Sequence, residues 1–338
     1  MHIPFRKLVA LSAAVLTLGL TPLAGLQAAE TTLRLSTLFR PDSDGGKAAQ
    51  AFADEVKART EGRVAVTVFP ASQLGDWVET HAQLMQGAID IGLQPLSTNF
   101  DRRLAIAWFP YIAPTYAEAQ EVFSADGFAY KLVDDMIAPQ GLRLLGVYSA
   151  GMGGAGFTKA VPEPSNPQVK RGLRIRVWPG GTTHRTMMER FGYQVATVPW
   201  AELYTAMQTG VIDGQIGGTA EMALDNFKDI TKTWVQYNDH LELAWFVINS
   251  KRLESLPEGD REIILAVAQE ISHKRFDEVR EADTQYLKDM EAAGIEVVRF
   301  DDATLEKLAD YTRKNVWPEI AGELDEATMK RLNDAVSQ

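Results

Sequence analysis

The chain has 338 residues, and its composition of 46 % hydrophobic and 23 % charged residues is that of a globular protein long enough for two domains. A formal net charge of −11 disfavours nucleic acid as a partner, because neutralising phosphates requires clustered Lys and Arg. The chain has no cysteine, so its stability has to come from a large hydrophobic core and not from disulfides.

The segment 1–29 has the pattern of a cleaved signal peptide. Arg6 and Lys7 precede an apolar run over 8–20, and small residues at 28–29 supply a cleavage site. A membrane anchor is the alternative, but about thirteen apolar residues are too few for a hydrocarbon core of ~30 Å. We therefore expect an exported protein that resides in the periplasm.

The segment 32–147 alternates between strand and helix patterns. Apolar periods of 2 and of 3.6 follow each other, which predicts an α/β fold. Strands are expected at 33–38, 64–69, 89–93 and 142–147. Gln94 follows the third of these strands at its open end, where sheets of this kind bind ligands.

The glycine-rich segment 151–156 matches the pattern G-x-G-x-x-G literally. A dinucleotide site would require a helix directly after the glycines, so that the N-terminus of the helix could hold the pyrophosphate. Residues 157–161 instead predict a strand, and three prolines follow by residue 167. We therefore expect no dinucleotide cofactor, and we interpret the glycines as a place where the chain crosses between domains.

The stretch 171–218 predicts a strand, a helix, a strand, a helix and a final strand. In the first strand, 173–177, apolar residues alternate with Arg174 and Arg176. Arg176 lies at the open end of that strand, and its guanidinium has the planar fork of donors that matches a carboxylate. A nearby Asp or Glu could pair with Arg176 instead, and Arg174 is expected to lie deeper as a structural partner. We take Arg176 as the centre of an anion-binding site.

The C-terminal third predicts a strand at 243–249 and then a long amphipathic helix that ends near Met290. If this helix starts at Pro257 or Asp260, it is about 45 Å long at ~1.5 Å per residue, enough to lie across two lobes. A strand at 295–300 is expected to follow it.

Several spaced motifs resemble one family of proteins. They are L-R-I-R-V at 173–177, P-W-A-E-L-Y-T-A-M-Q-T-G-V-I-D-G-Q at 199–215, P-A-S-Q-L-G at 70–75, G-A-I-D-I-G at 87–92 and F-V-I-N at 246–249. Together and in this order, the chain resembles the DctP-type solute-binding proteins of TRAP (tripartite ATP-independent periplasmic) transporters. The resemblance extends over almost the whole mature chain.

The resemblance implies a two-lobed periplasmic-binding-protein fold in which a long helix bridges both lobes. After the signal peptide 1–29, lobe I would comprise 30–150 and roughly 241–285. Lobe II would comprise 151–240 and roughly 286–338. A small organic anion would bind in the cleft between the lobes, and the small and large membrane subunits of the transporter would receive it.

The resemblance also implies roles for individual residues. The second arginine of the motif, Arg176, would clamp the carboxylate of the ligand. The other expected ligand contacts are Trp200, Trp178, Trp245, Phe39, Gln94, Gln215 and His240. Gly153 stands where many members have a second arginine, and Ile216-Gly217 where sialic-acid binders continue with Glu-Asn. Both departures disfavour sialic acid, and the first disfavours a dicarboxylate.

The residues predict binding and not catalysis. The five histidines are scattered, no His or acidic cluster has metal-ligand spacing, and no nucleophile–base pair is displayed. We expect no enzyme activity, no cofactor and no metal, and a sugar acid or hydroxy acid as the ligand. An organic sulfonate is an alternative ligand, and a ligand sensor for a membrane signalling protein is an alternative role.

Overall fold

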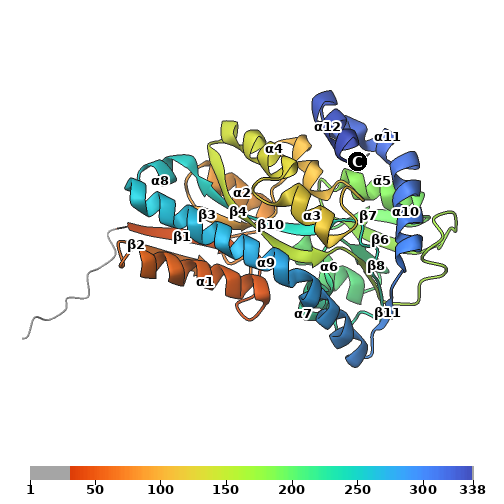
Figure 1. Ribbon diagram of the computed structural model, residues 1–338. Helices are drawn as coiled ribbons and strands as arrows, with labels where there is room; N and C mark the ends of the chain where they lie inside the picture. The colour runs from red at the N-terminus through yellow and green to blue at the C-terminus, as the bar shows by residue number, and fades with distance from the viewer. Residues whose placement is uncertain (1–30, 337–338) are drawn as a thin grey trace, which may run out of the picture.

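The computed structural model describes residues 31–336, so the signal peptide expected at 1–29 lies outside the described residues. The strands form two mixed sheets, one of five and one of six strands, and one long helix passes both of them (Figure 1). The predicted two-lobed α/β fold with a bridging helix is therefore confirmed. Among the residues described, no helix is both long enough and apolar enough to cross a membrane.

The first sheet has the strand order β2-β1-β3-β10-β4. Its strands are β1 (Thr31–Thr37), β2 (Val64–Phe69), β3 (Ile91–Gln94), β4 (Leu142–Met152) and β10 (Leu241–Asn249). Strands β1, β2 and β3 are parallel, and α1 (Asp44–Arg59) and α2 (Trp77–Met85) connect them. Strand β10 runs antiparallel to both β3 and β4, so a segment from the second half of the chain completes this sheet.

The second sheet has the strand order β11-β9-β5-β8-β6-β7. Its strands are β5 (Ala155–Phe157), β6 (Arg174–Val177), β7 (Gln194–Thr197), β8 (Gly214–Ile216), β9 (Thr233–Val235) and β11 (Glu296–Val298). Strands β6, β7 and β8 are parallel and are connected by α5 (Thr182–Arg190) and α6 (Trp200–Gln208), as the sequence predicts. The strand predicted at 157–161 is wrong, because β5 pairs with β8 and β9 only as far as Phe157.

The remaining helices cover the sheets and join the two parts of the molecule. They are η1 (Arg102–Trp108), α3 (Tyr116–Phe123), α4 (Phe128–Ile137), η2 (Ala138–Gln140), α7 (Ala220–Phe227), α8 (Ser250–Glu254), α10 (Asp302–Asn315), α11 (Trp317–Ile320), η3 (Ala321–Glu323) and α12 (Glu326–Val336). One hydrophobic cluster includes Leu144 of β4, Trp108 of η1 and Ile175 of β6. The core is therefore continuous between the two sheets.

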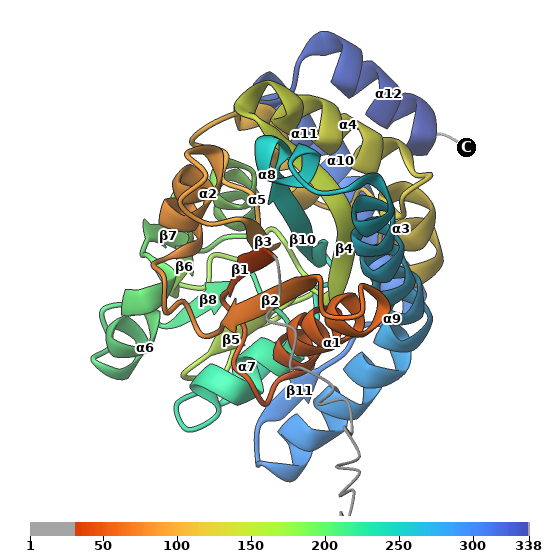
Figure 2. The same cartoon turned by 90° about the vertical axis from the view of Figure 1, so that its left-hand side faces the viewer.

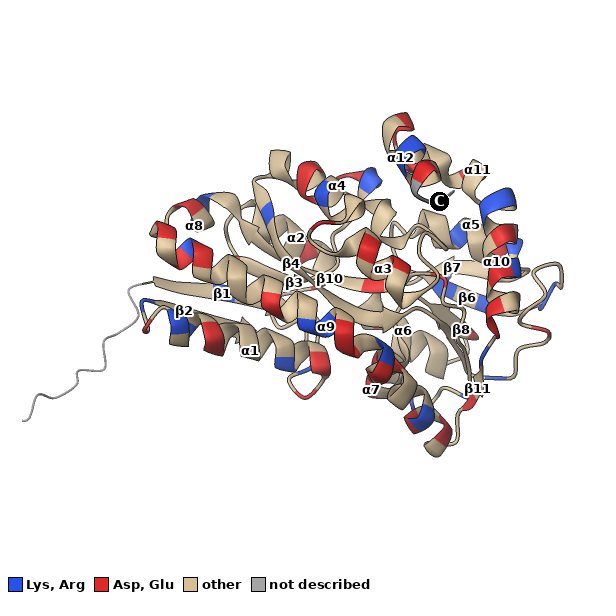
Figure 3. Ribbon diagram, viewed as in Figure 1, with Lys and Arg blue, Asp and Glu red and all other residues tan. Residues whose placement is uncertain are grey.

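Helix α9 (Glu258–Ala292) has 35 residues and is about 52 Å long at ~1.5 Å per residue. It packs against α1 and β4 of the first part and against α7 and β11 of the second (Figure 2). Acidic and basic residues are interspersed along its length in Figure 3, and its buried side carries apolar residues such as Ile264 and Val279. The helix thus supports both sheets along one side.

Strand β4 leads from the first sheet to β5 in the second through a segment that packs tightly against α9. Asp283 of α9 accepts hydrogen bonds from the backbone N–H of Met152 (2.7 Å) and from the Tyr116 hydroxyl (2.6 Å). Gly151 has a φ of +125°, and an added Cβ would lie 2.2 Å from a carboxylate oxygen of Asp283. Glycine is required here because a side chain would displace the helix that joins the two sheets.

We predict that Gly151→Ala lowers the free energy of unfolding by about 2–4 kcal/mol, since it combines a strained backbone with a steric clash. Gly259→Ala is the matched control, because an added Cβ at Gly259 of α9 meets no atom within 4 Å. This control should be neutral or slightly stabilising. Denaturant unfolding of both variants measures the difference, and equal stabilities would contradict the packing described for Gly151.

Candidate functional site

A cavity of about 50 Å³ lies between the two sheets, enough for a few water molecules. Its walls come from both parts of the molecule. The first part contributes Leu38, Ser72, Trp77, Pro95, Trp108 and Glu242, and the second contributes Arg176, Trp178, Trp200, Gly217, Gly218 and Met222. The sequence predicted three of these twelve residues as ligand contacts, namely Arg176, Trp178 and Trp200.

Arg176 is the cation of this cavity, with only 3 % of its surface exposed. Its Nε donates to the carbonyl of Val198 (2.8 Å), and its Nη1 donates to the carbonyl of Ile216 (3.4 Å). Within the described part of the chain, no carboxylate oxygen lies within 4.0 Å of it, and its Nη2 has no acceptor. Burial lowers the pKa of Arg176 to about 10, so the guanidinium remains charged at neutral pH.

The neighbouring arginine of the motif has a different environment. Arg174 was expected to lie deeper than Arg176, and this expectation is wrong because Arg174 is exposed. It stands at the outer end of β6, where its Nη1 donates to the carbonyl of Val211 (3.1 Å). Arg176 is buried because its part of β6 lies between β7 and β8 and because Trp200 covers its guanidinium.

Four tryptophans form most of the apolar wall, and they come from four different segments. The ring centroids of Trp77 and Trp108 are 6.1 Å apart, and those of Trp108 and Trp178 are 5.6 Å apart. The Arg176 guanidinium lies 5.7 Å from the ring centroid of Trp200, within cation–π range. An added Cβ at Gly217 would lie 2.7 Å from the Trp178 ring, so this glycine allows the ring to reach the cavity.

The other five residues that were expected to contact the ligand do not line this cavity. The Gln94 side chain accepts from the Thr80 hydroxyl (2.5 Å) and donates to the Trp77 carbonyl (3.2 Å), so it fixes the start of α2. The Gln215 amide, oriented with its nitrogen toward the main chain, donates to the carbonyls of Ile216 and Gly217. Both amides therefore support wall residues.

Of the four aromatic residues expected to contact the ligand, the two outside this cavity, Trp245 and Phe39, lie in the core. The Trp245 ring on β10 is buried against Tyr130, with ring centroids 6.1 Å apart. Phe39 packs edge-on against Tyr148 at 5.4 Å and borders a smaller cavity next to the first. Among the expected contacts, His240 remains, and it belongs to a buried polar network.

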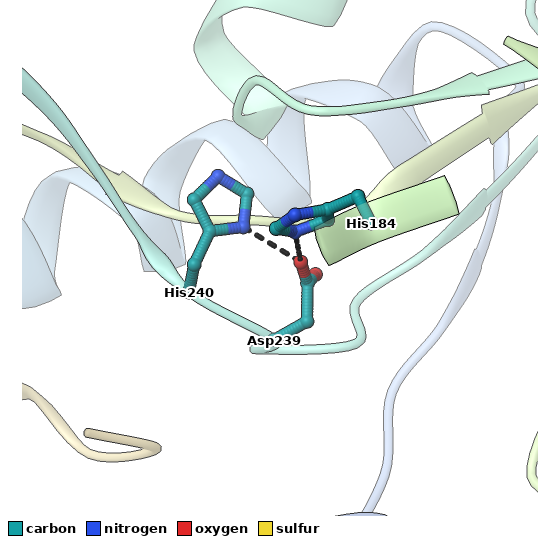
Figure 4. Close-up of side chains that lie close together, drawn as sticks. All are labelled: His184, Asp239 and His240. Carbon is teal, nitrogen blue, oxygen red and sulfur yellow. Dashed lines mark hydrogen bonds and ion pairs between the residues drawn. The ribbon is translucent and has the colours of Figure 1, made fainter. Parts of the chain in front are cut away.

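His240 and His184 share one carboxylate oxygen of Asp239 (Figure 4). The distances from Asp239 Oδ2 are 2.6 Å to His240 Nδ1 and 2.7 Å to His184 Nε2. The other ring nitrogen of His240 lies 2.9 Å from Oε2 of Glu242. The network therefore connects the protein interior to Glu242 in the cavity wall.

The network has a definite charge pattern. Burial would lower the pKa of His240, but the neighbouring charges of Asp239 and Glu242 prevail and raise it to about 10. Burial lowers the pKa of His184, which is therefore neutral at pH 7. Burial acts to raise the pKa of Asp239, but His240 and His184 hold it below its ordinary value. His240 is thus an imidazolium between two carboxylates.

His184, Asp239 and His240 are also the one group of metal-ligating side chains that the described residues bring together. Their ligand atoms all lie within 4.8 Å of one another, which is close enough to share a metal ion. The distances of 2.6 and 2.7 Å are those of charge-assisted hydrogen bonds, so proton sharing also accounts for this spacing. The group escaped prediction because His184 lies far along the chain from Asp239 and His240.

Near the cavity, a polar contact holds α1 against α7. A carboxylate oxygen of Glu221 accepts from the backbone N–H of Asp44 (2.9 Å), and Asp44 in turn pairs with Arg275 of α9 (3.3 Å). Glu221 is 1 % exposed, and its second oxygen has no hydrogen-bond partner in the described structure. Burial raises the pKa of Glu221 to about 7. This contact therefore depends on pH near neutrality.

We predict that Glu221 destabilises the fold increasingly as pH rises. The folded-state pKa of Glu221 near 7 lies above its ordinary value of 4.5. Glu221 therefore costs no free energy of unfolding below pH ~4.5, where it is protonated in both states, and its full cost is reached above pH ~7. Glu221→Gln keeps the acceptor for Asp44 and removes the charge. Relative to wild type, its free energy of unfolding should rise by roughly 2–4 kcal/mol between pH 4 and pH 8.

Denaturant unfolding at several pH values checks this prediction. Glu262→Gln, at an exposed position on α9, is the control and should follow the wild-type curve. Parallel pH dependence of Glu221→Gln and wild type would show that Glu221 titrates normally.

Comparison with known proteins finds relatives along most of the chain. Residues 35–323 match the family described as "Bacterial extracellular solute-binding protein, family 7" (DctP). A solute-binding protein of Albidiferax ferrireducens is 27 % identical over 278 residues, which cover 79 % of this chain and 78 % of the relative.

Solved structures share the fold. A TRAP periplasmic solute-binding protein from Polaromonas sp. JS666, bound to D-erythronate, is 24 % identical and has a TM-score of 0.79. That similarity covers 90 % of this chain and 98 % of the other. A TRAP periplasmic solute-binding protein from Roseobacter denitrificans, bound to L-galactonate, is 23 % identical with a TM-score of 0.75, covering 87 % of this chain and 97 % of the other.

Proposed function

Since the chain belongs to the family 7 (DctP) extracellular solute-binding proteins of TRAP transporters, we propose that it captures a small organic acid anion at Arg176. The role is binding and delivery, in keeping with a family of solute-binding transport proteins. The protein acts in the periplasm after removal of residues 1–29, and it passes its ligand to the small and large membrane subunits of the transporter.

The environment of Arg176 carries this proposal. Its guanidinium is buried and charged, and no described carboxylate neutralises it within 4.0 Å. The bonds to Val198 and Ile216 fix the orientation of the group and leave its terminal nitrogens able to donate toward the cavity. A carboxylate with two oxygens matches such an edge, and charge-assisted bonds of this kind are strong in a dry site.

Ligand capture requires an open form of the protein. The walls of the cavity come from both parts of the molecule, so the ligand enters when the two parts separate and is enclosed when they close. We propose the lobes expected from the sequence, 30–150 with 241–285 and 151–240 with 286–338. The pairing of β10 with β4 and of β11 with β9 supports this division.

The wall of the cavity limits the choice of acid. The relatives with bound D-erythronate and L-galactonate hold sugar acids. In this chain, Ser72, Arg176 and Glu242 are the polar side chains of the wall apart from the indole N–H groups. A ligand with many hydroxyls would find few partners here, which favours a short hydroxy acid or another compact carboxylate over a long sugar acid.

We predict that Arg176→Ala weakens the binding of a small monocarboxylate by on the order of 2–5 kcal/mol, because it removes a buried charged partner. A thermal-shift screen of small organic acids selects the probe, and calorimetry measures its affinity. Arg176→Lys should recover only part of the loss, since an ammonium keeps the charge but not the fork.

Arg174→Ala is the matched control, because this arginine of the same strand is exposed and outside the cavity. It should bind like wild type, and circular dichroism verifies that each variant folds. If Arg176→Ala binds the acid within twofold of wild type, the anion site lies elsewhere and the proposal fails.

A further inference from the structure

The cavity has a negative pole as well as a positive one. Glu242 stands at the start of β10 in the cavity wall, and 8 % of its surface is exposed. Its Oε2 accepts from His240, while Oε1 has no hydrogen-bond partner among the residues described. Arg176 does not pair with it, since no oxygen of Glu242 comes within 4.0 Å of the guanidinium. Both charged groups therefore present unpaired atoms to the same space.

The buried network behind Glu242 does not neutralise this pole. It places one ring, His240, between two carboxylates, with Nδ1 2.6 Å from Asp239 and Nε2 2.9 Å from Glu242. A single ring carries at most one positive charge, so it cannot neutralise both carboxylates. Oδ1 of Asp239 also has no hydrogen-bond partner among the described residues, but Asp239 does not line the cavity, so Glu242 is the carboxylate that the cavity wall presents.

A simple anion would fit only half of this site. Its carboxylate would neutralise Arg176 but would bring a second negative charge into a small space beside Glu242. Like charges in a medium of low dielectric repel strongly, and an unpaired buried charge is costly. A positive group on the same ligand would remove both penalties.

The apolar wall favours a positive group too. The rings of Trp77, Trp108 and Trp178 line the space, and the π-system of a tryptophan attracts a cation, most strongly where water is excluded. A carboxylate next to several tryptophan faces is a combination suited to an alkylated or primary ammonium group. The same faces offer few hydrogen bonds to a neutral hydroxyl-rich ligand.

We infer that the ligand is a compact zwitterion, an amino-acid-like or betaine-like carboxylate whose cationic nitrogen lies between the tryptophan faces and Glu242. The inference rests on the proposed function, because the ligand's carboxylate occupies Arg176. The two poles belong to different sheets, Glu242 to the first and Arg176 to the second. A zwitterion therefore bridges the two lobes and favours their closure.

Matched ligands that differ only in charge test the inference on the wild-type protein. Glycine betaine is paired with 3,3-dimethylbutanoate, and 4-(trimethylammonio)butanoate with 5,5-dimethylhexanoate, since each of these simple carboxylates replaces N⁺ by carbon. A third set compares 2-aminoisobutanoate with 2-hydroxyisobutanoate and pivalate. Calorimetry should show at least tenfold tighter binding of the zwitterion in one or more sets.

The outcomes separate the two proposals. If the simple carboxylates or the hydroxy acid bind as tightly as the zwitterions, the inference is overturned while the role of Arg176 in binding a carboxylate stands. If no compound in any set binds, the inference fails, while the carboxylate site at Arg176 is judged by the wider screen of organic acids.

Glu242→Gln gives an independent readout. The amide oxygen can still accept from His240, so the change removes the charge with little change in shape. The variant should lose at least tenfold in affinity for the zwitterion and should bind the matched simple carboxylate no worse than wild type. Glu262→Gln, exposed on α9, should leave both affinities unchanged. A Glu242→Gln variant that keeps the full preference for the zwitterion would refute the assigned role of Glu242.

Discussion

The buried charge of Arg176 is the constraint around which the site is built. A guanidinium in a dry interior is costly unless its donors are satisfied, and here main-chain carbonyls satisfy only part of them. Those carbonyls belong to Val198, just before α6, and to Ile216, at the end of β8. The positions of α6 and β8 beside β6 are therefore tied to the orientation of the arginine, and Trp200 at the start of α6 shields it from water.

Helix α9 connects this site to the rest of the molecule. Arg275 reaches the carbonyl of Ser149 (2.8 Å) in β4, and Asp283 holds Met152 where β4 leaves the first sheet. Arg275 also pairs with Asp44, whose backbone N–H bonds Glu221 of α7. One helix thus fixes the crossing strand and the contact between α1 and α7.

The sequence predicts local features of this fold well and distant pairings poorly. The succession β6, α5, β7, α6, β8 follows from apolar periodicity, and so does the place of Arg176 near the end of β6. The antiparallel entry of β10 between β3 and β4 depends on contacts between distant segments, which periodicity does not encode. Trp77, Trp108 and Glu242 escaped prediction for the same reason, since only folding brings them to Arg176.

Because Arg176 and Glu242 lie on different sheets, ligand recognition is connected to the relative motion of the two parts of the molecule. Without a ligand, closing the cleft takes Arg176 and Glu242 out of water and leaves each with unpaired atoms, which opposes closure. A ligand can shift the equilibrium only through contacts that it makes in the closed form and not in the open form. A ligand that pairs only with Arg176 satisfies one of the two charges and leaves Oε1 of Glu242 without a partner. The zwitterion that we infer would satisfy both charges, so discrimination between ligands would take place at closure and not at first encounter.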